Sequence, residues 1–139
     1  NGPSLAIRPG GRGDVTKSHV VWRARRGGPY IPSPVFYAGR LYMVNDGGIA
    51  TCYDGESGRT VFQGRLPASN FTSSLLAADE KLYITSEEGT TFVIAAGDEL
   101  KILSTNSLGE RSLATPAFSN GQILIRTERH LWCIGKKRQ

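Results

Sequence analysis

Residues 33–44 of the chain read Ser-Pro-Val-Phe-Tyr-Ala-Gly-Arg-Leu-Tyr-Met-Val, and a related stretch returns twice at an interval of 41 residues. It returns as Ser-Leu-Leu-Ala-Ala-Asp-Glu-Lys-Leu-Tyr-Ile-Thr at 74–85 and as Thr-Pro-Ala-Phe-Ser-Asn-Gly-Gln-Ile-Leu-Ile-Arg at 115–126. The similarity continues into polar turns and then into apolar triplets at 51–53, 92–94 and 132–134. Self-similarity at a fixed period indicates a repeat architecture.

Each unit is predicted to hold short strands joined by tight turns. Asn120-Gly121 is a strong hairpin signal, because both residues tolerate positive φ. The first unit then continues through a second turn and a Gly- and Asp-rich loop at 54–58 to a fourth strand at 59–63. No segment shows the apolar spacing of a capped helix. We therefore expect an all-β chain.

Four-stranded antiparallel units of about 40 residues are typical of β-propeller blades, which bury their apolar faces against one another. We expect residues 1–16 to be a flexible leader and residues 17–139 to be the repeat domain. Within this domain we expect a strand at 17–24, blades at 33–66 and 74–107, and a partial blade at 115–135. These strands add up to about three blades.

Composition excludes several other classes of protein. The 139 residues are 39% hydrophobic and 21% charged, with two cysteines, so a disulfide-dense scaffold is excluded. No apolar run approaches the roughly 20 residues of a membrane span. The net charge of +5 gathers at both ends, with Lys136, Lys137 and Arg138 in the tail, while the middle is acidic. Solvated ends explain this pattern better than a nucleic-acid-binding face.

The stretch from Gly48 to Phe62 resembles the PQQ-like repeat, because it has the pattern Gly-x-x-x-x-Tyr-Asp-x-x-Ser-Gly-x-x-x-Phe. The second unit departs from it, with Ala-Gly-Asp-Glu at 96–99 in place of the Asp-x-x-Ser-Gly turn. Such repeats build quinoprotein alcohol dehydrogenases and the propeller lipoprotein of outer-membrane protein assembly. The resemblance implies a β-propeller in an exported bacterial protein. It does not carry PQQ binding across, because the adjacent cysteine pair of the enzymes is absent, so PQQ and calcium are conceivable only in a full-length parent.

Propellers usually have four to eight blades, so three blades imply a larger protein or completion by oligomerisation. In the second case each chain would donate its strand at 17–24 to the last blade of a neighbour. Self-association by strand exchange is therefore one expectation, and a partial propeller is the other.

Candidate site residues lie in the turns and in the loops at one end of the blades. Asp46, Glu87 and Glu128 recur at one register, where a ring for a cation or polar ligand is one interpretation and the capping of turn N–H groups is the preferred one. His130 aligns with Gly48 and Gly89 at a surface turn. The loops at 28–32, 68–73 and 109–114 would contact a partner. The candidate partner-binding residues are Asp46, Glu87, Glu128, His130, Tyr30 and Arg111.

Three functions remain open from the sequence. The preferred one is a non-catalytic scaffold or binding module of a larger PQQ-repeat protein, which takes a protein or peptide partner. The first alternative is a fragment of a PQQ-dependent dehydrogenase, although no complete catalytic, cofactor or metal set is evident. The second is a basic nucleic-acid-binding domain, whose affinity would fall steeply with salt.

Overall fold

The structure is a computed structural model that describes residues 2–135, and the basic tail named above lies outside them. Within the described part the chain forms strands and no helix, so no helix there could span a membrane. The thirteen strands are β1 (Ser4–Ile7), β2 (Val20–Ala24), β3 (Val35–Tyr37), β4 (Arg40–Val44), β5 (Ile49–Asp54), β6 (Thr60–Arg65), β7 (Leu76–Ala78), β8 (Lys81–Thr85), β9 (Thr90–Ala95), β10 (Ile102–Ser107), β11 (Ala117–Ser119), β12 (Gln122–Arg126) and β13 (Leu131–Gly135).

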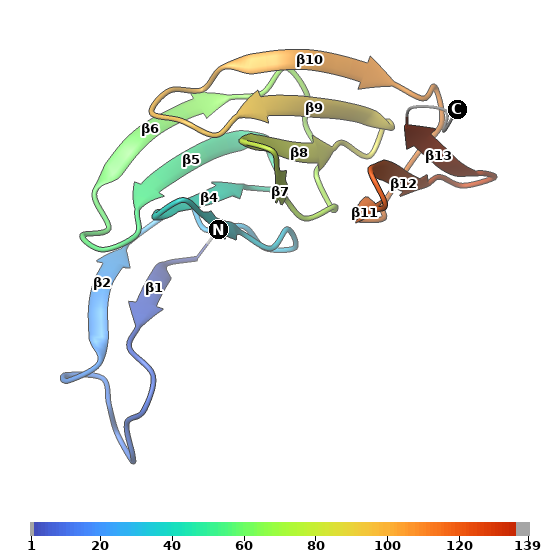
Figure 1. The fold of residues 1–139 in the computed structure, drawn as a ribbon. Coiled ribbons are helices and arrows are strands. Elements are labelled where there is room, and N and C mark those ends of the chain that lie inside the picture. The colour runs from blue at the N-terminus through green and yellow to red at the C-terminus, as the bar shows by residue number, and fades with distance from the viewer. Residues whose placement is uncertain (1, 136–139) are drawn as a thin grey trace.

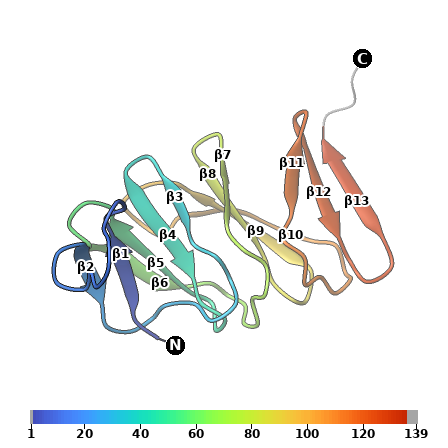
Figure 2. The ribbon, with the colours of Figure 1, turned by 90° about the horizontal axis from the view of Figure 1, so that it is seen from below.

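The strands form four antiparallel sheets that follow one another in sequence order (Figures 1 and 2). β3–β6 make the first blade and β7–β10 the second, each with four strands in chain order. β11–β13 make a three-stranded sheet, and β1–β2 make a two-stranded hairpin that projects from the other end (Figure 1). The prediction of an all-β chain built from four-stranded antiparallel blades, as in part of a propeller, is confirmed.

The two-residue turn at the start of each blade has the same backbone in all three units. Both central residues have positive φ at Ala38-Gly39, at Asp79-Glu80 and at Asn120-Gly121. This is the type I′ geometry that matches the right-handed twist of the flanking strands. Asn-Gly adopts it readily, whereas Asp79 and Glu80 adopt it with φ of 48° and 58° against their own preference. The sheet therefore imposes the turn on the second unit.

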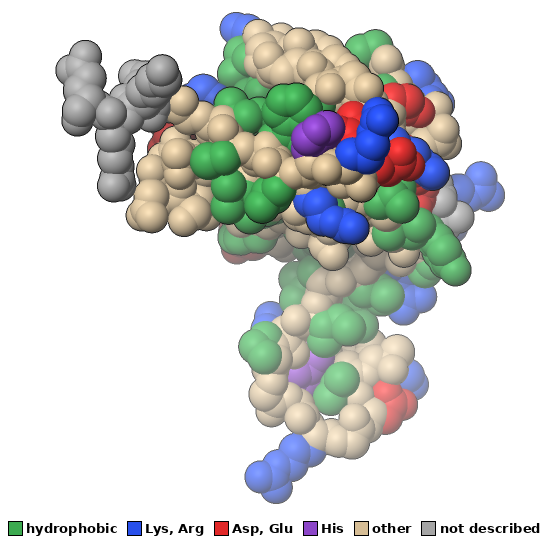
Figure 3. All heavy atoms as spheres, turned by 90° about the vertical axis from the view of Figure 1, so that its right-hand side faces the viewer, with side chains coloured by type: hydrophobic (Ala, Val, Ile, Leu, Met, Phe, Trp, Pro, Cys, Tyr) green, Lys and Arg blue, Asp and Glu red, His purple; other side chains and the backbone are tan. Residues whose placement is uncertain are grey.

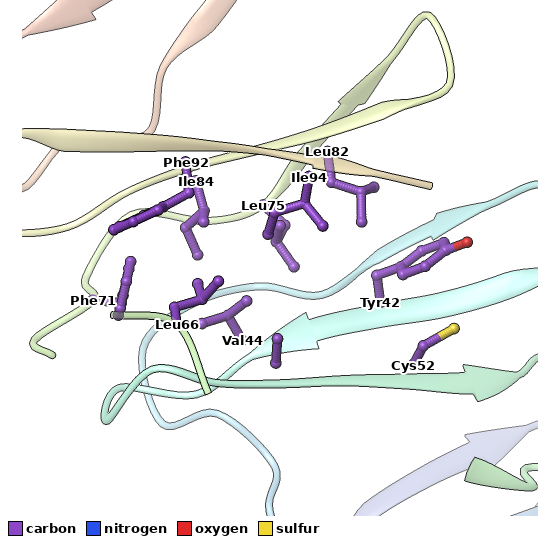
Figure 4. Close-up of a cluster of buried hydrophobic side chains, with 11 residues drawn as sticks. Tyr42, Val44, Cys52, Leu66, Phe71, Leu75, Leu82, Ile84, Phe92 and Ile94 are labelled. Carbon is purple, nitrogen blue, oxygen red and sulfur yellow. The ribbon is translucent and has the colours of Figure 1, made fainter. Parts of the chain in front are cut away.

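The largest core lies between the first and second blades (Figure 4). Tyr42, Val44 and Cys52 of the first blade point at Leu82, Ile84, Phe92 and Ile94 of the second, with Leu66, Phe71 and Leu75 of the connecting segment between them. Ile84 and Cys52 are fully buried. Burial of this kind stabilises by roughly 1.5–3 kcal/mol for each large apolar side chain.

The hairpin at the N-terminal end differs from the expectation for residues 1–16. Residues 4–7 form β1, which pairs with β2 from Ser4↔Ala24 to Ile7↔Val20 and makes the strand count thirteen rather than twelve. Trp22 on β2 explains why this hairpin forms, because its ring stacks on Tyr53 at 5.8 Å and its Nε1 donates to the Gly55 carbonyl. Exchange of β2 between chains, which we expected as one way to complete the propeller, would require its pairing with β1 to break.

The imposed turn of the second blade gives a test of this fold. Replacing Asp79-Glu80 by Asn-Gly should raise the free energy of unfolding by about 1 kcal/mol, because it removes left-handed strain from two residues. The measurement is urea denaturation. The matched control is Gly121→Glu in the third unit, where an added Cβ meets no atom within 4 Å, so the only cost is the positive φ of 74°. That variant should lose a similar amount, and a loss of stability in the Asn-Gly variant would contradict the assigned turn.

Candidate functional site

The predicted site residues lie along one row of loops, which we call the loop rim: Tyr30, Asp46, Glu87, Arg111, Glu128 and His130. Hydrogen bonds between successive loops hold this row together. The Phe71 N–H donates to the Asp46 carbonyl at 3.0 Å, and 41 residues later the Ser112 N–H donates to the Glu87 carbonyl at 3.0 Å. The Glu128 N–H likewise donates to the Arg111 carbonyl. The repeat in sequence is therefore also a repeat in backbone hydrogen bonding.

Asp46 uses its carboxylate to hold the loop at 28–32. Its two oxygens accept the N–H groups of Tyr30 at 2.8 Å and of Ile31 at 3.2 Å. The Tyr30 ring itself points outward and is 87% exposed. Asp46 and Tyr30 thus come together through the backbone, and the tyrosine ring is the part of this pair that is free to contact a partner.

Glu87 has the same role one blade later, with different donors. The Thr72 hydroxyl donates to it at 2.6 Å and Arg111 Nη2 donates at 2.9 Å. The Thr72 hydrogen bond, followed by that of Arg111, holds the pKa of Glu87 below its ordinary value. Because the Arg111 side chain is 55% exposed, the ion pair itself adds little stability. Asp46 and Glu87 therefore serve the bland interpretation, in which the acid satisfies loop donors.

Glu128 does not share this arrangement. The third turn is one residue shorter than the first two, because Val44 pairs with Ala50 and Thr85 with Thr91, whereas Arg126 pairs with Leu131. The turn hydrogen bond that ends at Ile49 and Thr90 in the first two blades ends at His130 in the third. The exposed Glu128 side chain faces a hollow that it shares with Arg111 and Arg126.

The lost residue corresponds to Gly48 and Gly89, so our alignment of His130 with these glycines is wrong. Both glycines have positive φ and lie against a carbonyl of the following loop, that of Ala68 or Glu110. A side chain could not fit there. His130 instead occupies the position after the deleted glycine.

A buried glutamate, Glu110, organises the third turn and is the residue that the sequence analysis missed. It is 9% exposed. His130 Nδ1 donates to it at 2.7 Å, the Thr127 hydroxyl at 2.9 Å, and the Arg129 N–H also donates. Trp132 Nε1 in turn donates to the Thr127 oxygen at 3.1 Å. The repeat comparison passes over Glu110 because its equivalent beside Gly48 is Ala68, so no acid recurs at this register.

These donors lower the pKa of Glu110 from its ordinary 4.5 to about 2, and the His130 hydrogen bond is the largest cause. With the carboxylate ionised, Nδ1 of His130 must carry the proton. The other ring nitrogen faces away from Glu110 on a side chain that is 62% exposed. The network therefore fixes His130, Arg129 and Glu128 as a rigid turn at the open end of the chain.

Charged side chains gather on this end of the molecule (Figure 3). Two adjoining hollows, of about 370 and 210 Å³, share Arg126, Thr127 and Glu128. The first also reaches Arg129 and His130, and the second reaches Arg111. The loop rim thus divides in two: Tyr30 with Asp46 on the first blade, and Arg111, Glu128 and His130 around the hollows of the third, with Glu87 between them.

The donor groups do not fit a metal or a quinone cofactor. Among residues 2–135, no three His, Cys, Asp or Glu side chains are close enough together to hold a metal ion. The two cysteines lie in different blades: Cys52 is buried on β5, where burial raises its pKa, and Cys133 is exposed on β13. We therefore derive no chemistry through PQQ or calcium from these residues.

The glutamate network predicts a specific titration. In side-chain carboxyl NMR, Glu110 should titrate near pH 2, and His130→Ala should move its pKa up toward 4.5. Because the folded-state pKa is depressed, the stabilisation is present above pH 4.5 and is lost as pH falls toward 2. The control is Glu128→Gln, an exposed neighbour that should leave the pKa of Glu110 unchanged. A Glu110 pKa near 4.5 in the parent protein would contradict this hydrogen-bond network.

Comparison with known proteins found similarity in structure alone, since no protein-family model and no curated protein sequence matches the chain. BamB from Moraxella catarrhalis superposes with a TM-score of 0.66 at 15% identity, over 78% of this chain and 34% of BamB. A europium-containing methanol dehydrogenase gives 0.58 at 12% identity, over 74% and 21% of the two chains. Quinohemoprotein alcohol dehydrogenase from Comamonas testosteroni gives 0.58 at 14% identity, over 68% and 16%.

The chain thus spans about a third of the length of BamB and a fifth or less of each dehydrogenase. Identities of 12–15% show a shared fold and no more. Together with the four-stranded antiparallel sheets, they show that this chain has the fold of a partial β-propeller of the PQQ-like kind found in BamB and the quinoprotein dehydrogenases.

Proposed function

We propose that this chain is a non-catalytic part of a larger PQQ-repeat propeller and binds a protein or peptide partner through its loop rim. The observation that supports this most is the turn held by Glu110. A buried, fully hydrogen-bonded carboxylate fixes the backbone beneath Glu128, Arg129 and His130, whose side chains are exposed beside two hollows. Side chains held in place before binding lose less conformational entropy when they contact a partner.

The charge of this surface suggests what such a partner carries. Arg126 and Arg129 are exposed, and Arg129 lies 3.5 Å from the Glu110 carboxylate. Arg111 is half-exposed beside Glu87, and Glu128 is the one exposed acid of the third turn. The side chains around the hollows are therefore mostly cationic, which favours a partner segment with carboxylates, because arginine binds them in a bidentate manner. Tyr30, 87% exposed on the first blade, would add an aromatic contact.

An exported location is part of the same proposal. It rests on the resemblance to the outer-membrane assembly lipoprotein and on the fold shared with BamB.

A peptide-display selection tests the loop rim. A library of random 12-residue peptides is selected on the full chain and then counted on Arg126→Glu/Arg129→Glu. We expect acidic peptides to be enriched and to lose about tenfold or more in affinity on the charge-reversed variant, because several charge-assisted hydrogen bonds are removed. Lys101→Glu/Arg59→Glu, two exposed charges on other loops, is the matched control. Peptides that bind all three proteins equally would overturn the proposed rim.

The dehydrogenase alternative has its own test. Thermal unfolding is followed with and without PQQ and Ca²⁺. A ligand that binds only the folded state raises the melting temperature, by an amount equivalent to about 2.7 kcal/mol at a hundred times its Kd. We expect no rise, because the donor groups of residues 2–135 do not fit this cofactor. A saturable rise that requires both PQQ and Ca²⁺ would favour the enzyme instead.

A further inference from the structure

An apolar groove of about 300 Å³ runs between the second and third blades, away from the loop rim. Its walls come from β8, β9 and β10 on one side and from β12 and β13 on the other, including Tyr83, Val93, Ile123 and Ile134. Tyr83 and Phe118 close its inner end, with ring centroids 4.9 Å apart. The groove is thus a built space between two sheets rather than a gap at a loose edge.

The same place between the first and second blades is filled. The register makes Tyr42 the equivalent of Tyr83, since they pair with Cys52 and Val93, and makes Gly64 the equivalent of Asn106, since they pair with Ala50 and Thr91. There the free space is only about 10 Å³. Leu100 fills it, lying so close over Gly64 that a Cβ on that glycine would be 2.6 Å from Leu100 Cδ2.

Two further contacts seat the segment that carries Leu100. Asp98, two residues before it, forms an ion pair with Arg40, whose Nη1 also donates to the Gly97 carbonyl at 3.4 Å. The residues after Leu100 form β10, which pairs with β9. The first interface is therefore completed by three features in order: an acid, an apolar side chain two residues later, and an extended strand.

The second interface offers the counterpart of each feature. Lys81 takes the position of Arg40, since they pair with Ala95 and Asp54. The groove is the counterpart of the space that holds Leu100. Within residues 2–135, the outer edge of β13 pairs with no strand, although β13 corresponds to β9.

β13 is also built like a covered strand rather than an edge strand. It reads Leu-Trp-Cys-Ile-Gly, without a charge, and Leu131 is 71% exposed. The outer strands β6 and β10 both have a register shift in their pairing, and β10 is mostly polar. Bulges and polar side chains protect a sheet edge from unwanted pairing, and β13 has neither.

We infer that the groove between the second and third blades binds an extended segment of a partner polypeptide. This segment carries an acidic residue for Lys81, a leucine-like residue two positions later for the groove, and then a strand that pairs with β13. A second copy of the chain fits less well, because β2, β6 and β10 are each already paired along their inner edges. The site shares no residue with the loop rim and does not depend on it.

The test uses a fluorescent synthetic peptide with the sequence of residues 97–107, which carries all three features, and the full chain. We expect saturable binding by fluorescence anisotropy, with hydrogen-exchange protection appearing on β13. Leu100→Ala in the peptide should weaken binding by about tenfold or more, because it leaves the groove unfilled. Leu103→Ala, whose side chain is 46% exposed on β10, should change binding less than about threefold. Asp98→Lys in the peptide should weaken binding, and Lys81→Glu in the protein should restore it.

Two protein variants decide where the peptide lies. Asn106→Trp, a substitution of an exposed residue at the groove, should block binding, whereas Arg126→Glu/Arg129→Glu at the loop rim should not. The inference is overturned if binding is absent, if Leu103→Ala weakens it as much as Leu100→Ala, or if protection changes on β9 rather than on β13. It is also overturned if sedimentation shows a dimer that Asn106→Trp converts to monomer, because the groove would then hold a second copy.

Discussion

Burial between successive sheets is the interaction on which the rest of this structure depends. Each blade has apolar side chains on both faces, and a single small sheet cannot shield both of them. The second blade solves this by presenting Leu82 and Ile84 to the first and Tyr83 and Val93 to the third. The turns, the loop rim and the groove are all positioned by this stacking, which is why hydrogen bonds between loops recur at the same interval as the sequence repeat.

The third unit shows what happens when the repeat changes by one residue. Without the positive-φ glycine, the turn after β12 tightens and places His130 where it can reach Glu110. Glu110 then accepts donors from the turn that in the first two blades lies against a following loop. A deletion that looks minor in the sequence thus converts a packed turn into a hydrogen-bonded, charged one. The same end of the chain carries the uncovered edge of β13 and the groove beside it.

The two surfaces differ in the physics that would drive binding. The loop rim is polar, and its acids are largely used to hold backbone, so recognition there depends on a few exposed cations and one tyrosine. The groove is apolar and lies beside a strand with unsatisfied pairing groups, so recognition there combines burial with main-chain hydrogen bonds. Partner proteins with different chemistry could therefore occupy the two surfaces independently.

The sequence alone determined the class of the fold, because a 41-residue repeat of alternating strands and Gly-rich turns is a local pattern that period and turn chemistry reveal. It also placed Asp46 and Glu87 in turns and favoured their role as caps, which the hydrogen bonds support. Only the tertiary structure decided the rest. Strand β1 lies in a Gly- and Pro-rich stretch and forms because β2 and Trp22 provide an edge and a packing surface. Glu110 gains its role from donors 17–20 residues away, and the groove exists only because Leu100 has no counterpart between two particular sheets. Such features depend on contacts between distant residues, which no local pattern in the chain records.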